Sequence, residues 1–214
     1  MGRPVTREDS ALAVLLFGDR RVPRTLTGVP IRSADTDGAI GPYRRLVVVG
    51  ADADLAAVLT RLLRADRLDI EVAYVPRRRT RATRIYRLPA GRRAARRARR
   101  GLARRVTLVR DETGSVVVGR AGWLPAEGRR LRGEAVVDDT VLFDGEASAV
   151  DVEPTLAVPG LRARVATGRR RWVAGRAVQL GSTGVSVVRD GVPAPRPARR
   201  STFYRNVEGW LAVR

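Results

Sequence analysis

The stretch that decides the fold is RLVVVGADADLAAVLTRLL, residues 45–63. It opens with a short apolar run, Arg45–Val49, whose β-branched residues are typical of a strand buried on both faces. Gly50 interrupts the run. Leucines and a valine then recur at the spacing of one helical stripe, which predicts an amphipathic helix. The members of this stripe are Leu55, Val58, Leu59, Leu62 and Leu63.

The flanking sequence extends this unit in both directions. Leu68–Val75 (LDIEVAYV) alternates apolar and polar residues and predicts a second strand, parallel to the first because a helix connects them. Residues 90–103 predict a helix with alanines inward and arginines outward, ended by Gly101. Upstream, Leu12–Phe17 fits a buried strand or a short helix, and residues 28–43 have the turn density of a loop.

The hydrophobic period changes from 3.6 to 2 near residue 104. Short strands follow, separated by turn signals that include Asp138-Asp139, Asp144-Gly145 and Asp190-Gly191. This spacing indicates an antiparallel sandwich or distorted barrel. The expected strands are residues 105–110, 115–119, 134–137, 141–143, 149–152, 161–165, 172–180, 184–188 and 210–213.

The sequence therefore predicts an α/β N-terminal domain of parallel βαβ type, followed by an antiparallel, all-β, sandwich-like C-terminal domain. Residues 1–43 form a poorly defined N-terminal segment. Residues 44–103 form the α/β domain, which is truncated, and residues 104–214 form the β domain.

Composition restricts the chemistry. The chain has no cysteine and no histidine, which excludes disulfides, thiolate metal sites and Ser-His-Asp triads. All 42 basic residues are arginine, against 22 acidic residues, for a formal charge of +20. Guanidinium groups match phosphate well, so nucleotide phosphates, anionic lipid head groups and nucleic acid bound nonspecifically are all admissible partners. A bias toward GC-rich codons would produce the same composition without selection for function.

The N-terminal sequence does not have the pattern that we expect of an export signal. The apolar run Ala11–Gly18 follows acidic residues, whereas a signal peptide begins with positive charge. No stretch approaches the ~20 apolar residues that span a bilayer. We therefore expect a cytoplasmic protein, either soluble or peripheral at a membrane. The sequence leaves the oligomeric state open, with a homodimer as one option.

The segment Val47–Val58 resembles the strand, Gly-Gly-Asp-Gly-Thr turn and helix of the diacylglycerol kinase catalytic family, which includes bacterial lipid kinases and sphingosine kinase relatives. Gly50 and Asp52 agree with that motif. In the family, glycines let backbone amides approach the nucleotide phosphates at a helix N-terminus. Here methyl groups and a carboxylate crowd that place, in the form of Ala51, Ala53 and Asp54. The alternative is a plain strand-to-helix turn with an aspartate cap.

A second segment, residues 76–89, resembles the family's Pro-x-Gly-Thr-x-Asn-Asp-like loop, with arginines in place of its core. Such a loop can meet phosphate through guanidinium groups. The resemblance implies ATP and Mg²⁺ as cofactors, with Asp52 at the metal. The implied nucleotide contacts are Gly50, Asp52, Asp54, Arg77, Arg78, Arg79 and Thr80.

A third segment, Val185–Val192, is similar to the family's Val-x-Val-Asp-Gly-Glu stretch, whose aspartate acts as the base on the lipid hydroxyl. That role falls on Asp190. Asp144 is a competing candidate, because the sequence Phe143–Glu146 is closer to this family stretch but comes earlier in the chain. An Asp-Gly pair is also an ordinary hairpin turn.

Three hypotheses follow. The first is a diverged lipid kinase-like protein, a catalytically weak or inactive pseudoenzyme that binds phosphate-bearing ligands. The second is an active ATP-dependent lipid kinase that transfers a phosphoryl group to an alcohol. The third is a basic nucleic-acid-binding protein of unrelated function.

Overall fold

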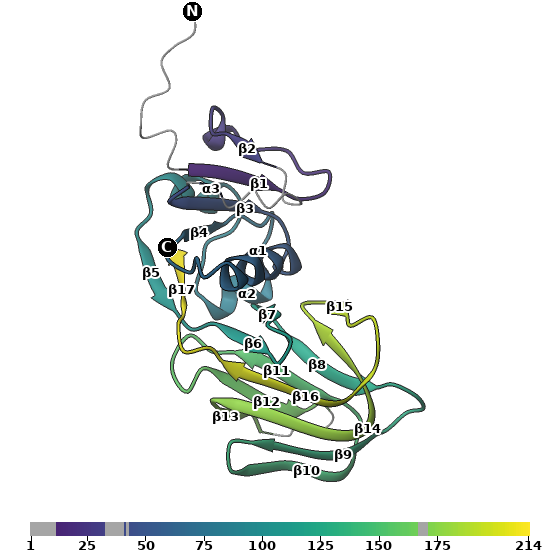
Figure 1. The fold of residues 1–214 in the computed structure, drawn as a ribbon. Coiled ribbons are helices and arrows are strands. Elements are labelled where there is room, and N and C mark those ends of the chain that lie inside the picture. Colours follow the sequence, from purple (N-terminus) through teal and green to yellow (C-terminus); the bar gives the residue numbers. More distant parts are fainter. Residues whose placement is uncertain (1–11, 33–40, 42, 167–170) are drawn as a thin grey trace, which may run out of the picture. The chain divides into compact units, whose positions relative to one another are not determined.

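A computed structural model describes residues 12–32, 41, 43–166 and 171–214. The chain divides into two units. The first comprises the described residues up to Val106 together with Gly209–Arg214, and the second is Thr107–Glu208. The first unit is an α/β unit and the second is an antiparallel β unit, which confirms the predicted fold class (Figure 1).

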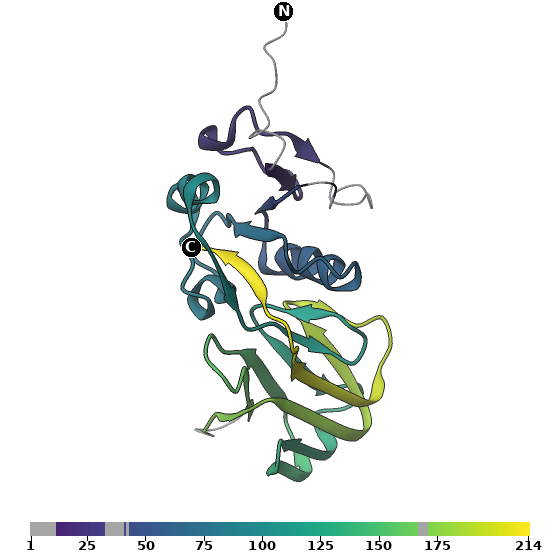
Figure 2. The same ribbon diagram turned by 60° about the vertical axis from the view of Figure 1, so that its left-hand side comes forward.

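The first unit is built on a six-stranded sheet with strand order β2-β1-β3-β4-β17-β5 (Figure 2). All neighbouring pairs are parallel except β17 and β5. The N-terminal apolar run, for which strand and helix were both open, is a strand in register with β3. The strands are β1 (Leu12–Leu16), β2 (Ile31–Arg32), β3 (Arg45–Val49), β4 (Glu71–Tyr74), β5 (Ala103–Val106) and β17 (Trp210–Val213).

Helices α1 (Asp52–Arg64) and α3 (Gly91–Arg100) cover opposite faces of this sheet (Figure 2). Successive strand residues point to opposite faces, so β3 supplies Val47 and Val49 to the face packed against α3. The contact face of α3 consists of alanines, which bring the helix close to the sheet. Both helices therefore match the predicted patterns. The described part of this unit also contains two short helices, η2 (Arg24–Leu26) and α2 (Arg81–Ile85).

A buried arginine fixes the end of α3. Arg45 is 7% exposed, and its guanidinium donates to the carbonyl oxygens of Ala98 at 2.9 Å, Arg99 at 3.1 Å and Gly101 at 2.9 Å. Its Nε also pairs with the Glu71 carboxylate at 2.6 Å. Arg45 thus satisfies carbonyl groups that a helix leaves unpaired at its C-terminus.

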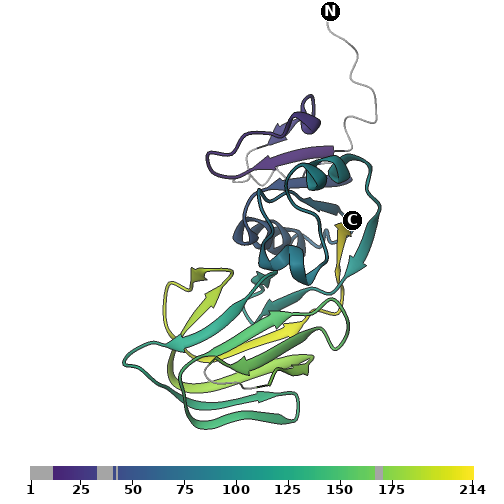
Figure 3. The ribbon, with the colours of Figure 1, turned by 180° about the vertical axis from the view of Figure 1, so that it is seen from behind.

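The second unit is an eleven-stranded antiparallel sheet, seen from behind in Figure 3. Trp123 and Phe203, both fully buried, contact each other in its core with ring centroids 5.6 Å apart. The strands are β6 (Val109–Asp111), β7 (Val116–Val117), β8 (Ala121–Pro125), β9 (Leu131–Val137), β10 (Thr140–Ala147), β11 (Val150–Pro154), β12 (Leu161–Val165), β13 (Val173–Gly175), β14 (Ala177–Arg189), β15 (Val192–Pro193) and β16 (Ala198–Arg205).

Several expected boundaries are wrong. Residues 28–43, expected to form a loop, contain β2, and residues 172–180, expected to form one strand, are divided at Arg176 between β13 and β14. Residues 105–110 are not one strand, because β5 pairs in the first sheet and β6 in the second. Asp144-Gly145 is not a turn: it lies within β10, where pairing with Glu134 and Gly133 continues the ladder. Residues 177–189 form one strand, since β14 shifts its register between Gly181 and Val185 instead of ending.

The other two turn signals are correct. Asp138-Asp139 joins β9 to β10, and Asp190-Gly191 joins β14 to β15. Asp190 and Gly191 both have positive φ, 48° and 87°, as a two-residue type I′ hairpin requires.

Candidate functional site

The parallel strands β1, β3 and β4 end at one edge of the first sheet, and a cavity of about 650 Å³ lies there. Ligands of α/β sheets commonly bind at this carboxyl edge. Val49 and Val75 contribute apolar walls. The charged lining is strongly basic and consists of Arg20, Arg21, Arg77 and Arg92, with Asp19 as the acidic member.

The first turn of α3 also lines this cavity. Gly91 adopts φ +57°, and its backbone N–H donates to the carbonyl oxygen of Pro76 at 2.8 Å. No side chain caps this helix, and its first turn contains no acidic residue. The partial positive charge of the α3 N-terminus therefore adds to that of the arginines.

The first turn of α1, in contrast to that of α3, carries negative charge. The Asp54 carboxylate accepts the backbone N–H of Ala51 at 2.6 Å, which is one of the two hydrogen bonds of a capping box; the N-cap alanine has no side-chain acceptor for the other. It lies directly over Gly50, because a Cβ placed on that glycine would be 2.7 Å from the Asp54 Cβ and Oδ2 atoms. The chain's own carboxylate thus occupies the place where a phosphate would meet this helix N-terminus.

The second aspartate of the turn, Asp52, joins two other elements. Its Oδ1 accepts the Tyr74 hydroxyl at 2.8 Å, and its Oδ2 accepts the backbone N–H of Ala82 at 3.1 Å. Burial, and after it the charge of Asp52 and this hydrogen bond, raise the pKa of Tyr74, whereas Thr80 and Arg20 oppose the shift. Tyr74 therefore stays a donor, and Asp52 holds the end of β4 to the start of α2.

The predicted arginine loop contributes unequally. Arg77 lines the cavity, whereas Arg78 and Arg79 are exposed beside it. Thr80 is the N-cap of α2, because its hydroxyl accepts the backbone N–H of Thr83 at 3.2 Å. Sequence reasoning missed Arg20, Arg21 and Arg92 as cavity residues. The available signal for the first two was their position just after the N-terminal strand.

The α1 turn offers no free ligand atoms for Mg²⁺ among the side chains that the resemblance implies. Both Asp52 oxygens hold protein donors, and Asp54 fills the turn. Within the described ranges no three acidic side chains group as a metal site. The residues of this turn do not fit a magnesium-bound nucleotide, whereas the neighbouring cavity has a basic lining without Asp52 or Asp54.

The two candidate bases belong to the second unit. The Asp190 carboxylate accepts the backbone N–H groups of Val118 at 3.0 Å, Gly119 at 2.7 Å and Arg120 at 2.9 Å. It therefore anchors this segment to the β14–β15 hairpin. Proton acceptance by this carboxylate would weaken those bonds.

Asp144 is exposed on β10 and far from Asp190. It pairs with Glu134 on β9, which pairs in turn with Gly181 on β14. Gly181 lies nine residues before Asp190, which directly follows β14, a separation of up to roughly 30 Å at ~3.3 Å per residue. The two aspartates cannot serve one site.

Comparison with known proteins places the fold. No family model and no curated protein matches the sequence. A diacylglycerol kinase structure from Bacillus anthracis str. Sterne is 12% identical, with a TM-score of 0.71, 95% of this chain and 96% of that chain being covered. An NAD kinase from Archaeoglobus fulgidus in complex with ATP has 12% identity, a TM-score of 0.65 and coverages of 95% and 93%. Yeast NADH kinase complexed with NADH has 11% identity, a TM-score of 0.54 and coverages of 86% and 65%. The expected resemblance to diacylglycerol kinases is confirmed as a shared fold.

Proposed function

We propose that this chain, which has the fold of the diacylglycerol and NAD kinase structures, binds a phosphate-bearing ligand at the carboxyl edge of its parallel sheet and has lost most or all phosphoryl transfer. The observation that carries this proposal is the Asp54 carboxylate folded onto the Gly50–Ala51 turn. A like charge at that place opposes a nucleotide phosphate.

The cavity supports the binding half of the proposal. Its volume falls within the range of ligand pockets, about 300–1,000 Å³. Arg20, Arg77 and Arg92 approach from three different segments. Guanidinium groups hold phosphate oxygens by paired, charge-assisted hydrogen bonds. The apolar walls would receive the uncharged part of the ligand, for which a nucleotide is the class that the similar structures favour.

Calorimetric titration with pyrophosphate, ADP and ATP, with and without Mg²⁺, tests the binding. We expect the nucleotides to bind without Mg²⁺, and Mg²⁺ to weaken ATP binding because it neutralises the charge that the arginines recognise. The double variant Arg20→Gln with Arg92→Gln should lose about tenfold or more in affinity, since a hydrogen bond to a charged group contributes about 1.5–3 kcal/mol. The matched control is Arg61→Gln with Arg64→Gln, at the opposite end of α1. Equal losses in both variants would contradict the site.

Incubation with labelled ATP, Mg²⁺ and diacylglycerol in mixed lipids tests the catalytic half. We expect no phosphorylated lipid above background. Lipid product that disappears in Asp190→Asn would refute the loss of transfer and establish the active kinase instead. Mg²⁺-dependent tightening of ATP binding would point the same way.

A further inference from the structure

The positive charge of this protein is concentrated in one unit. Residues 1–106 with 209–214 carry 26 arginines against 10 acidic residues, a formal charge of +16. Residues 107–208 carry 16 against 12, a formal charge of +4. Between Glu71 and Asp111 there are fifteen arginines and no acidic residue. A codon bias acting on the whole chain does not explain this difference between the two units.

Helix α3 presents the densest part of this charge. Its alanines are buried against the sheet, so its outer surface consists of arginine side chains that are all exposed. We name this surface the arginine ridge; it comprises Arg92, Arg93, Arg96, Arg97, Arg99 and Arg100. Arg99 donates to the carbonyl oxygen of Thr25 at 3.1 Å. Among the described residues, no carboxylate forms an ion pair with the ridge.

The spacing of the ridge arranges its arginines in two rows. At about 3.6 residues per turn, residues three and four apart share a side of the helix. Arg92, Arg96 and Arg99 therefore follow one flank, and the other row consists of Arg93, Arg97 and Arg100. The helix has ten residues and so extends about 15 Å. The ridge is convex and carries charge on both flanks.

We propose that the arginine ridge docks duplex nucleic acid by its phosphate backbone. A convex helix with cations on both flanks matches two rows of phosphates on either side of a groove, and the DNA major groove, about 12 Å wide, admits an α-helix. A flat anionic bilayer would meet mainly the crest of the ridge. The apolar face of α3 is buried against the sheet, so the helix has no apolar surface to insert into a bilayer.

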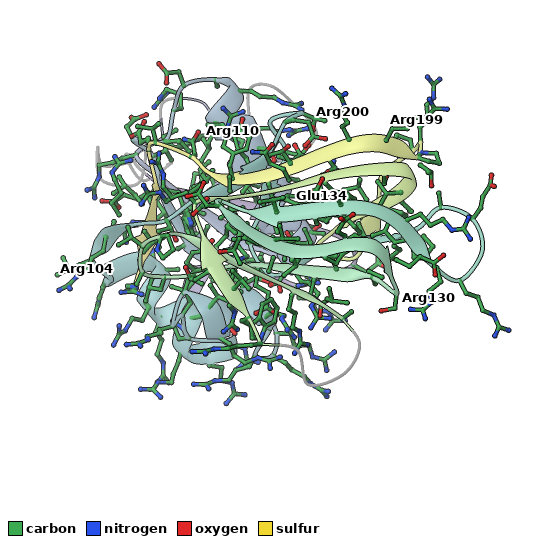
Figure 4. All side chains as sticks on the ribbon, turned by 90° about the horizontal axis from the view of Figure 1, so that it is seen from below. Arg104, Arg110, Arg130, Glu134, Arg199 and Arg200 are labelled. Atoms are coloured by element: carbon green, nitrogen blue, oxygen red, sulfur yellow. The ribbon has the colours of Figure 1, made fainter. Side chains whose placement is uncertain are left out.

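The test is fluorescence anisotropy of the full chain with a labelled short DNA duplex, over a series of salt concentrations. The variant is Arg93→Gln, Arg97→Gln and Arg100→Gln, which leaves the cavity residue Arg92 unchanged. The control removes the same charge from the second unit by Arg130→Gln, Arg199→Gln and Arg200→Gln, all exposed (Figure 4). Circular dichroism confirms that both variants keep their helix content, and arginine-to-lysine replacement at the three ridge positions tests charge alone.

We expect the log–log salt slope of the ridge variant to fall by about 2.7, which is ~0.9 for each lost phosphate contact. The control should keep its slope, and the lysine variant should keep most of the binding. Equal losses in the ridge and control variants would overturn the proposal in favour of diffuse attraction. It would also be overturned if the ridge variant lost binding to phosphatidylserine vesicles but not to the duplex, since the partner would then be a membrane.

Discussion

Replacement of Arg45 by methionine tests the device that holds α3 in place. Methionine keeps the length and apolar stem of the side chain but removes its four hydrogen bonds. Three backbone carbonyls at the end of α3 lose their donor. The Glu71 carboxylate, whose side chain is 15% exposed, keeps only the more distant Arg44 at 3.3 Å. Removing one partner of a buried ion pair costs about 3–5 kcal/mol, and we expect a loss in that range.

The assay is urea denaturation of the full chain, read by circular dichroism. Arg67→Met is the matched control, because Arg67 pairs with Asp69 at 3.0 Å on the exposed surface and should contribute less than about 1 kcal/mol. In the Arg45→Met background, Glu71→Gln should restore part of the stability, since it removes the charge that was left without its main partner. A loss below about 1 kcal/mol for Arg45→Met, or strict additivity of the two changes, would refute this reasoning.

Three further predictions concern the site and its surroundings. Asp54→Thr with Ala51→Gly should destabilise the chain by about 0.5–2 kcal/mol, because the cap is lost, yet raise its affinity for ATP. Thermal melting measures the stability and calorimetry measures the affinity. Unchanged ATP affinity would contradict the inference that Asp54 blocks the turn. The pKa of Tyr74 is higher in the folded than in the unfolded chain, so stability should fall as pH rises above about 10, where only the unfolded chain releases the proton. Tyr74→Phe should reduce this decline in melting experiments. A decline of the same size in the variant would contradict a role of Tyr74 in it. Asp190→Ala should cost at least about 2 kcal/mol, since three backbone N–H groups lose their acceptor; a neutral effect in urea denaturation would remove its anchoring role.

Local periodicity was sufficient to predict much of the fold. The run Arg45–Val49, the apolar stripe of α1 and the alternation in β4 each encode their own structure, because neighbouring residues determine which face is buried. The sequence-based predictions fail where pairing between distant segments determines the local structure. Asp144-Gly145 has the composition of a turn, yet β9 supplies partners that keep it extended. Nothing near Arg45 in the sequence indicates a helix end more than fifty residues later.

The candidate site was less predictable for the same reason. The crowding at Asp54 could be predicted from the motif. The hydrogen bond from the Ala51 N–H to the Asp54 carboxylate depends on the geometry of the helix cap. Because alanine occupies the N-cap, the usual sequence signature of such a cap is missing. Arg20 enters the cavity only because β1 pairs in parallel with β3 and so ends at the same edge. A residue's contribution to a cavity is a property of strand order, which a single sequence does not encode locally.

Two helices begin at this edge, and their first turns carry opposite charge. Asp52 and Asp54 oppose the N-terminal dipole of α1, whereas the first turn of α3 carries Arg92 and Arg93 and no acidic residue. A phosphate approaching the edge would therefore meet repulsion at α1 and attraction at α3. An aspartate-capped turn at α1 therefore does not by itself exclude anion binding at this edge. In this fold the favourable position for an anion would then lie at the guanidinium groups beside α3, and not at the backbone amides of the α1 turn.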